Sequence, residues 1–159
     1  MDNMKRTGIP KGYTLVELAI VLALMTIIAT YAIPAWQHYA ANINLKTAAR
    51  GVMADIFNAR QRAIEENLNA YRITFNIANN NYTLSRADTG VTLWTKSLAS
   101  FGSGISINSI NFNNGSIVSF QRRGTVTMGT VVLKNLIGST ATITVQITAR
   151  MYVQYTMQK

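Results

Sequence analysis

The chain has 159 residues and no cysteine, so neither a disulfide framework nor a thiolate metal site can form in it. Its 15 basic and 6 acidic residues give a formal net charge of +9, which favours anionic partners such as lipid head groups, nucleic acid or acidic proteins. Only 13% of the residues are charged, about half the usual share. Gly, Ser, Thr and Asn fill the second half instead, which is typical of a small domain of short strands and polar turns.

A long apolar segment follows a basic flank at the start of the chain. Glu17 is the only formal charge from residue 12 to residue 45, and the run LAIVLALMTIIATYAI at 18–33 contains two threonines as its only polar residues. Counted over 13–35, the segment reaches the ~20 residues that a membrane-spanning helix needs. Because positive flanks stay in the cytoplasm, we expect a single-pass protein whose remaining chain lies outside the cytoplasm.

Three interpretations of this segment are open. A cleaved secretory signal explains the basic flank, but the apolar run is longer than the usual ~7–15 residues, and Glu17 lies at its start. An ordinary single-span anchor explains the length but not Glu17, since an unpaired carboxylate in lipid costs several kcal/mol. It also leaves unexplained why Gly12 separates the basic flank from the apolar run. The third interpretation accounts for both residues.

The sequence Lys-Gly-Tyr-Thr-Leu-Val-Glu-Leu at 11–18 resembles the prepilin processing signature, in which a glycine separates a basic leader from an apolar helix. The resemblance implies that a prepilin peptidase cuts between Gly12 and Tyr13 and removes the leader 1–12. It also implies that the new N-terminus at Tyr13 is methylated. The family usually has phenylalanine there, and Tyr13 keeps the aromatic ring.

The same resemblance gives roles in filament assembly to Glu17 and Pro34. Glu17 would pair with the N-terminal amine of Tyr13 in a neighbouring subunit, which neutralises both groups inside the filament. Family members often carry a proline near Pro34, where the loss of one hydrogen bond kinks or locally melts a helix. The alternative for Pro34 is a plain helix terminus at the membrane face.

A second helical pattern covers residues 36–68. Apolar residues recur there at steps of three and four, which predicts one apolar helix face: Leu45, Ala49, Val52, Ile56, Ala59 and Ala63, widened by Ala48, Met53 and Ile64. An unbroken helix over 13–68 would be ~84 Å long. The outer half of such a helix needs a partner that covers its apolar face.

Short strands are predicted in the remaining sequence, and they supply this partner. Alternating apolar and polar residues, separated by Asn, Asp and Gly turns, predict strands at 71–77, 82–86, 91–95, 105–110, 117–122, 125–133 and 141–155. We therefore expect an α+β fold in which the second half of a long N-terminal helix packs against a small antiparallel β domain. The segment 101–104 is expected to be a loop.

A closer resemblance covers nearly the whole chain. The segment LKTAARGVMADIFNARQRAIEENLNAYRITF at 45–75 is similar to the helix and first strand of the GspH/FimT group of pseudopilins and minor pilins. IVSFQRRGTVTMGTVVLKN at 117–135 and TITVQITARMYV at 142–153 resemble the C-terminal pattern of that group. The usual Gly-Arg pair near the end of the group's sequences appears here as Ala149-Arg150.

This resemblance implies a structural subunit at or near the tip of a type IV pilus or a type II secretion pseudopilus, and it leaves open which of the two. The partners would be other pilins or pseudopilins, the prepilin peptidase and the inner membrane. The expected organisation is a cleaved leader at 1–12, a membrane and filament-core helix at 13–35, and a periplasmic domain at 36–159. That domain would consist of a helical half at 36–69 and a sheet region at 70–159.

The residues favour neither an enzyme nor a metal site. The single histidine, His38, lies near the expected membrane face, and there is no cysteine nucleophile. Glu65 and Glu66 are adjacent on a helix, so their side chains point about 100° apart. No group of residues gathers the oxygen ligands of a calcium site, and no phosphate-binding glycine loop is present. We expect no catalytic residue, metal or cofactor.

DNA binding is the alternative function. Some FimT-like minor pilins take up DNA, and Arg122 and Arg123 beside Gly124, together with Arg150, could contact phosphates. The competing interpretation is a solvated turn, which we favour. The DNA-binding members carry a Gly-Arg-x-Arg tail, whereas the sequence here is Ala-Arg-Met-Tyr at 149–152.

Overall fold

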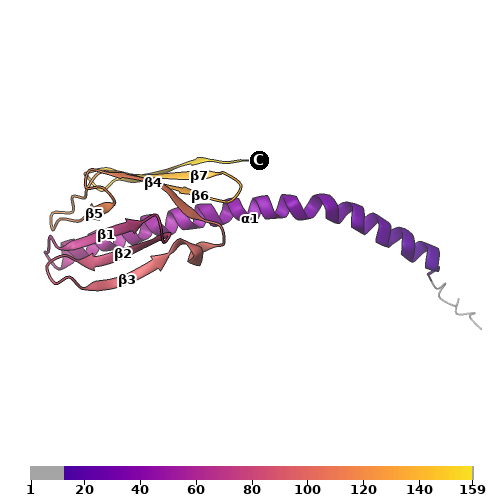
Figure 1. Cartoon of the computed structure of the whole chain (residues 1–159), viewed down its shortest axis with the longest axis horizontal. Coiled ribbons are helices and arrows are strands. Elements are labelled where there is room, and N and C mark those ends of the chain that lie inside the picture. The colour runs from indigo at the N-terminus through magenta and orange to yellow at the C-terminus, as the bar shows by residue number, and fades with distance from the viewer. Residues whose placement is uncertain (1–12, 159) are drawn as a thin grey trace, which may run out of the picture. The chain divides into compact units, whose positions relative to one another are not determined.

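A computed structural model of the chain describes residues 13–158 and consists of one long helix followed by short strands (Figure 1). The predicted leader and Gly12 lie outside the described residues. The chain divides into two compact units between Gln37 and His38. The helix α1 (Leu15–Glu65) belongs to both units, and all the strands belong to the second.

Helix α1 begins at a side-chain cap. The Thr14 hydroxyl accepts a hydrogen bond from the Glu17 backbone N–H at 3.2 Å, and the Thr14 carbonyl accepts one from the Leu18 N–H. Thr14 and Glu17 have the spacing of a capping box, in which a threonine and a glutamate three residues later satisfy the free N–H groups of a helix start. The helix therefore starts two residues after the beginning of the predicted segment.

Pro34 lies inside α1 and does not end it. A proline removes one backbone hydrogen bond and crowds the carbonyl four residues earlier, but helical residues continue on both sides. The interpretation of Pro34 as a helix terminus is therefore wrong.

The C-terminus of α1 is closed by a left-handed residue. Asn67 has φ 52°, the Asn67 N–H bonds to the Ile64 carbonyl, and the Leu68 N–H bonds to the Ala63 carbonyl. These two bonds form a Schellman motif, with asparagine in place of the usual glycine. The helix ends at Glu65, three residues before the predicted end.

The strands form two four-stranded sheets in which every pair is antiparallel. Sheet 1 has the order β3-β2-β1-β5 and consists of β1 (Tyr71–Asn76), β2 (Asn81–Arg86), β3 (Thr92–Ser97) and β5 (Ile117–Ser119). Sheet 2 has the order β4-β6-β7-β8 and consists of β4 (Ser106–Phe112), β6 (Gly129–Lys134), β7 (Thr140–Val145) and β8 (Met151–Thr156). Figure 1 shows the strands beside the C-terminal half of α1.

Several predicted boundaries in the sheet region are wrong, and the strand predicted at 117–122 ends at Ser119. The segment 141–155 is a hairpin of β7 and β8 rather than one strand, and β6 begins at Gly129 instead of residue 125. The predicted loop at 101–104 starts within a short 3₁₀ helix, η1 (Leu98–Phe101).

The predicted apolar face of the helix is the inner face of the second unit. All six residues of the predicted stripe are buried: Leu45, Ala49, Val52, Ile56, Ala59 and Ala63. Ala48 is also buried, whereas Ile64 is exposed. The buried residues belong to one core with inward-facing residues of both sheets, among them Ile73, Tyr82, Val131 and Ile143. The α+β class and the packing of the helix against antiparallel strands are confirmed.

Candidate functional site

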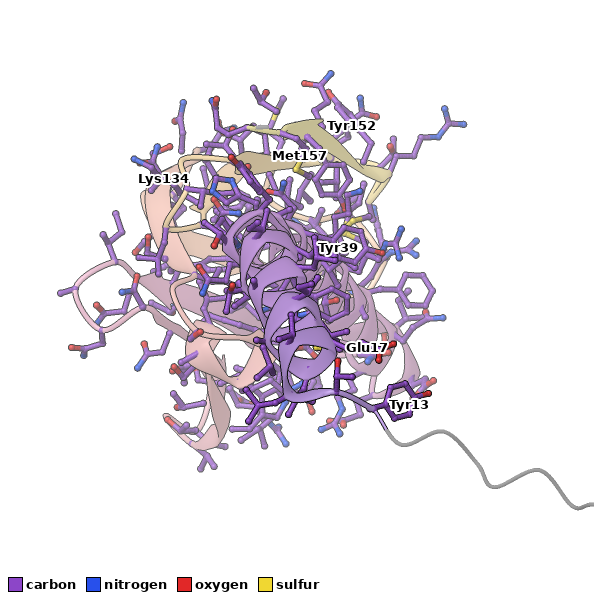
Figure 2. The ribbon with its side chains drawn as sticks, turned by 90° about the vertical axis from the view of Figure 1, so that its right-hand side faces the viewer. Tyr13, Glu17, Tyr39, Lys134, Tyr152 and Met157 are labelled. Atoms are coloured by element: carbon purple, nitrogen blue, oxygen red, sulfur yellow. The ribbon has the colours of Figure 1, made fainter. Side chains whose placement is uncertain are left out.

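Two of the predicted processing and assembly residues, Tyr13 and Glu17, lie at the exposed start of α1. Tyr13 is 88% exposed and Glu17 is also exposed, and Figure 2 labels both side chains there. Together with Leu18 and Val21 they line a small hollow on the helix surface. Among the described residues, no cation lies within ion-pair distance of the Glu17 carboxylate. The carboxylate is therefore available to a group from outside this part of the chain.

The first turns of α1 expose an apolar surface. Leu18, Val21, Leu24 and Ile28 are each between 44% and 66% exposed. By length and composition the helix could cross a membrane, with a mean hydropathy of 2.3 over its most apolar window and none of that window buried. Such a surface needs lipid or other apolar helices around it, because water would not solvate it favourably.

Arg122 and Arg123 are exposed on a turn that contacts the end of the helix. The Arg122 backbone N–H bonds to the Asn69 side-chain oxygen at 2.8 Å, and the Arg60 Nε bonds to the Gly124 carbonyl at 2.8 Å. Gly124 has φ 81°, and a Cβ there would lie 2.9 Å from the Arg60 guanidinium. The structure therefore brings Arg60 to this turn. The periodicity of the helix sequence could not predict this contact, because Arg60 and Gly124 are 64 residues apart.

Arg150 lies on a neighbouring turn at the beginning of β8. The Gln146 N–H bonds to the Arg150 carbonyl, and the Val126 N–H bonds to the Ile147 carbonyl. The β7–β8 turn thus contacts the segment that follows Gly124. All three predicted arginines are exposed and lie on turns of the second unit, as expected of solvated cations.

A buried carboxylate joins the helix to sheet 1. Asp55 on α1 is 7% exposed, accepts a hydrogen bond from the Tyr82 hydroxyl at 2.6 Å, and contacts Lys96 Nζ at 2.7 and 2.8 Å. Burial, followed by the hydrogen bond to Asp55, raises the pKa of Tyr82 far above its ordinary value of 10.0. Lys96 also lies 4.9 Å from the centre of the Trp94 ring. Both Asp55 side-chain oxygens have hydrogen-bond partners, so this cluster connects α1 to sheet 1 and leaves no oxygen free for a ligand.

The described residues hold no metal-binding cluster, since no group of three or more His, Asp or Glu side chains converges there. His38 is exposed on α1. The arrangement offers an exposed apolar N-terminal helix, a linked helix-and-sheet unit, and basic turns.

The comparisons with known proteins address both parts of the chain. Residues 10–33 match the prokaryotic N-terminal methylation motif. The structure is similar to that of the minor pseudopilin EpsH from the type 2 secretion system of Vibrio cholerae, with a TM-score of 0.54 and 15% sequence identity over 70% of this chain and 96% of EpsH. The chain has the fold of a minor pseudopilin behind a prokaryotic N-terminal methylation motif. A comparison with curated protein sequences finds no match.

The pseudopilin fold explains the order of the elements. A long N-terminal helix is followed by antiparallel sheets, as expected from the resemblance to the type IV pilin superfamily. The methylation motif covers Tyr13, Glu17 and most of the exposed apolar segment. At 15% identity the similarity to EpsH concerns the fold and does not transfer the roles of individual residues.

Proposed function

We propose that the chain is a minor pilin or pseudopilin, a structural subunit at or near the tip of a type IV pilus or type II secretion pseudopilus. The observation that carries the proposal is the methylation motif at residues 10–33, which continues into an exposed apolar helix on a pseudopilin fold. In this proposal residues 1–12 are a leader, 13–35 lie in the inner membrane or filament core, and 36–159 lie in the periplasm. The partners are other pilins or pseudopilins and the prepilin peptidase.

Processing and assembly follow in two steps. The peptidase cuts between Gly12 and Tyr13 and exposes an amine that is then methylated. Glu17 of one subunit pairs with the Tyr13 amine of another, because a carboxylate surrounded by apolar helices is strongly unfavourable without a positive partner. This pairing fixes the stagger between subunits, while the exposed apolar surface of α1 is buried against neighbouring helices.

The first test is the mass of the mature protein purified from the membranes of the producing cell. We expect an N-terminus at Tyr13 with one added methyl group. A Gly12→Val variant is the control and should keep the leader. An N-terminus near Tyr31 or Pro34 would indicate an ordinary secretory signal and would contradict the filament role.

The second test separates two roles of Glu17. Glu17→Ala should leave membrane insertion intact but lower the amount in sheared filaments by about tenfold or more, which corresponds to at least about 1.4 kcal/mol of lost pairing energy. Glu17→Gln is the matched control, since glutamine can still serve in a capping box but carries no charge. If Glu17→Gln assembles normally, Glu17 acts as a helix cap and the proposed pairing is wrong.

DNA binding remains a second candidate because Arg60 joins Arg122 and Arg123 at one turn. Arginines gathered on one turn can contact phosphates without reading the sequence. We favour the filament role, since the motif and fold support it independently of these arginines.

A further inference from the structure

The edges of the two sheets differ in how they are protected. Natural proteins block strand addition with charged edge residues, bulges or very short edge strands. The edge strand β3 carries Lys96 and has a bulge in its pairing between Leu84 and Ser85. β4 has a bulge between Ile107 and Ser109, and β5 has only three residues. Each of these three edges has a feature that discourages a further strand.

The edge strand β8 has none of these features. Its sequence Met-Tyr-Val-Gln-Tyr-Thr contains no charge and no proline, and its six residues pair with β7 in unbroken register. Val, Tyr and Thr also favour the extended conformation. Within the described chain, no strand pairs with the outer side of β8. This edge is therefore open to a further strand.

The register identifies the backbone groups that face outward. The Gln146 N–H bonds to the Arg150 carbonyl, so residues 146 and 150 form a hydrogen-bonded pair of the antiparallel ladder. Hydrogen-bonded and non-hydrogen-bonded pairs alternate, so the even-numbered residues of β8 bond to β7. The N–H and C=O groups of Met151, Val153 and Tyr155 then point toward the open side.

The end of β8 is held in place by side-chain hydrogen bonds. The Gln158 N–H donates to the Ser139 hydroxyl at 2.9 Å, and the Gln158 carbonyl accepts from the Asn42 amide at 3.2 Å. The Ser139 hydroxyl in turn donates to the Asn42 side-chain oxygen at 2.6 Å. A strand that is already fixed loses little conformational entropy when another strand is added.

The charge around β8 favours an acidic partner. All six acidic residues of the chain lie at or before Asp88, so sheet 2 and its turns carry no carboxylate. Arg150 immediately precedes β8, and the exposed Lys134 on β6 aligns with the end of β8 through Thr140 and Thr156. Two strand spacings, about 10 Å, separate Lys134 from β8. One cation, Arg150, therefore lies at one end of the open edge, and a second, Lys134, lies two strands inside the other end.

A second copy of the chain would be repelled. From Tyr13 onward the chain has 12 basic and 5 acidic residues, a net charge of +7, so two copies carry like charge.

We propose that the open edge of β8 binds an extended, carboxylate-bearing segment of a different filament subunit as an added strand. The inference rests on the proposed filament role. Tyr152, 43% exposed and labelled in Figure 2, lies beside this edge and offers an aromatic side chain for cross-strand contact.

The test uses the full-length protein in detergent micelles and two synthetic peptides, Glu-Thr-Val-Thr-Val-Thr-Glu and its lysine-ended counterpart. Hydrogen exchange of individual amides is measured with each peptide at up to about millimolar concentration. We expect the glutamate-ended peptide to slow exchange of the Met151, Val153 and Tyr155 amides by about tenfold or more, and the lysine-ended peptide to have no such effect. Equal effects of both peptides, or no effect of either, would overturn the proposal.

Two variants test the geometry. Val153→Pro removes an outward N–H without removing a bond to β7 and should abolish the peptide effect, whereas Val153→Ala shortens the same side chain, keeps the N–H and should retain the effect. If the proline variant unfolds, Arg150→Gln tests the proposal instead. It should weaken the slowing of amide exchange by the glutamate-ended peptide several-fold. Protection that rises with protein concentration without peptide would indicate self-pairing and would contradict the proposal.

A negative result in the peptide test can be distinguished from a negative result in the filament tests. Peptide binding requires neither processing nor assembly, so a missing peptide effect leaves the filament role standing. An N-terminus other than Tyr13 would remove the filament role and with it a filament subunit as the partner, whereas a peptide effect would still show strand addition at β8.

Discussion

Ala149 occupies a backbone conformation that is unfavourable for alanine. It lies in the turn between β7 and β8 with φ 60°, and its N–H bonds to the Gln146 carbonyl. The left-handed region costs an L-residue roughly 1–2 kcal/mol, whereas glycine enters it freely. The resemblance to the GspH/FimT group implies glycine at this position, and the φ of Ala149 gives the physical reason.

We expect Ala149→Gly to stabilise the protein by about 0.5–1 kcal/mol, since relief of the strain exceeds the extra entropy of glycine in the unfolded chain. Thermal unfolding in detergent should show a rise in Tm of about 1–4 °C. Ala141→Gly is the matched control, because Ala141 is buried on β7 and its substitution should lower Tm. A lower Tm for Ala149→Gly would show that the alanine methyl group contributes more through packing than it costs in strain.

At the scale of the elements, the apolar packing of α1 against sheet 1 includes one buried carboxylate. Asp55 lies among the apolar residues of the helix face and is bonded to Tyr82 on β2 and Lys96 on β3. The 3.6-residue periodicity predicted the buried face, but it gave no sign that Asp55 would be part of it. Its partners are 27 and 41 residues away, and no local pattern specifies contacts over such separations.

We expect Asp55→Asn to destabilise the protein by about 1–3 kcal/mol. This is less than for a fully buried pair, because the Lys96 side chain is 42% exposed and regains water. Tyr82→Phe should cost about 1.5–3 kcal/mol alone and less in the Asp55→Asn background, since an asparagine oxygen accepts only a weaker, neutral hydrogen bond from the Tyr82 hydroxyl. Additive effects in chemical denaturation would contradict the link.

The raised pKa of Tyr82 predicts a loss of stability at alkaline pH. The folded state keeps the neutral phenol, so its contribution is complete below the ordinary pKa of 10.0 and falls as pH rises above it, where the unfolded state ionises. Tyr82→Phe should weaken this alkaline loss in unfolding measurements between about pH 9 and 11. An unchanged pH dependence would assign the loss to other tyrosines.

The element types were largely predictable, whereas several boundaries were not. The long apolar run and the stripe predicted α1, and alternation predicted most strands. The β7–β8 turn was missed because Ile-Thr-Ala at 147–149 lacks the Gly, Asn or Pro that usually marks a turn. The separation into two sheets also depends on long-range pairing, such as β5 with β1, that a linear pattern does not specify.

For the whole molecule, the separation of charge is the main electrostatic feature. The last 71 residues carry six basic residues and no acidic side chain, whereas every Asp and Glu lies earlier. Such a surface binds polyanions weakly and without specificity at low salt. Weak DNA binding alone is therefore no sign of a DNA-uptake function, and a test must ask whether the binding is localised.

The fragment 38–159 contains every residue of the core and is suited to a DNA titration at several salt concentrations. The variants are Arg122→Gln/Arg123→Gln and Arg150→Gln, and a Lys46→Gln/Arg50→Gln control removes the same charge as the first from the exposed side of α1. If binding only reflects net charge, the two double variants should lose a similar small affinity, and we expect this result. A DNA-uptake site would instead lose most of its affinity in the Arg122/Arg123 variant, with the salt slope reduced by about one unit per lost phosphate contact. That loss, with the Lys46/Arg50 control unaffected, would move DNA binding ahead of a purely structural role.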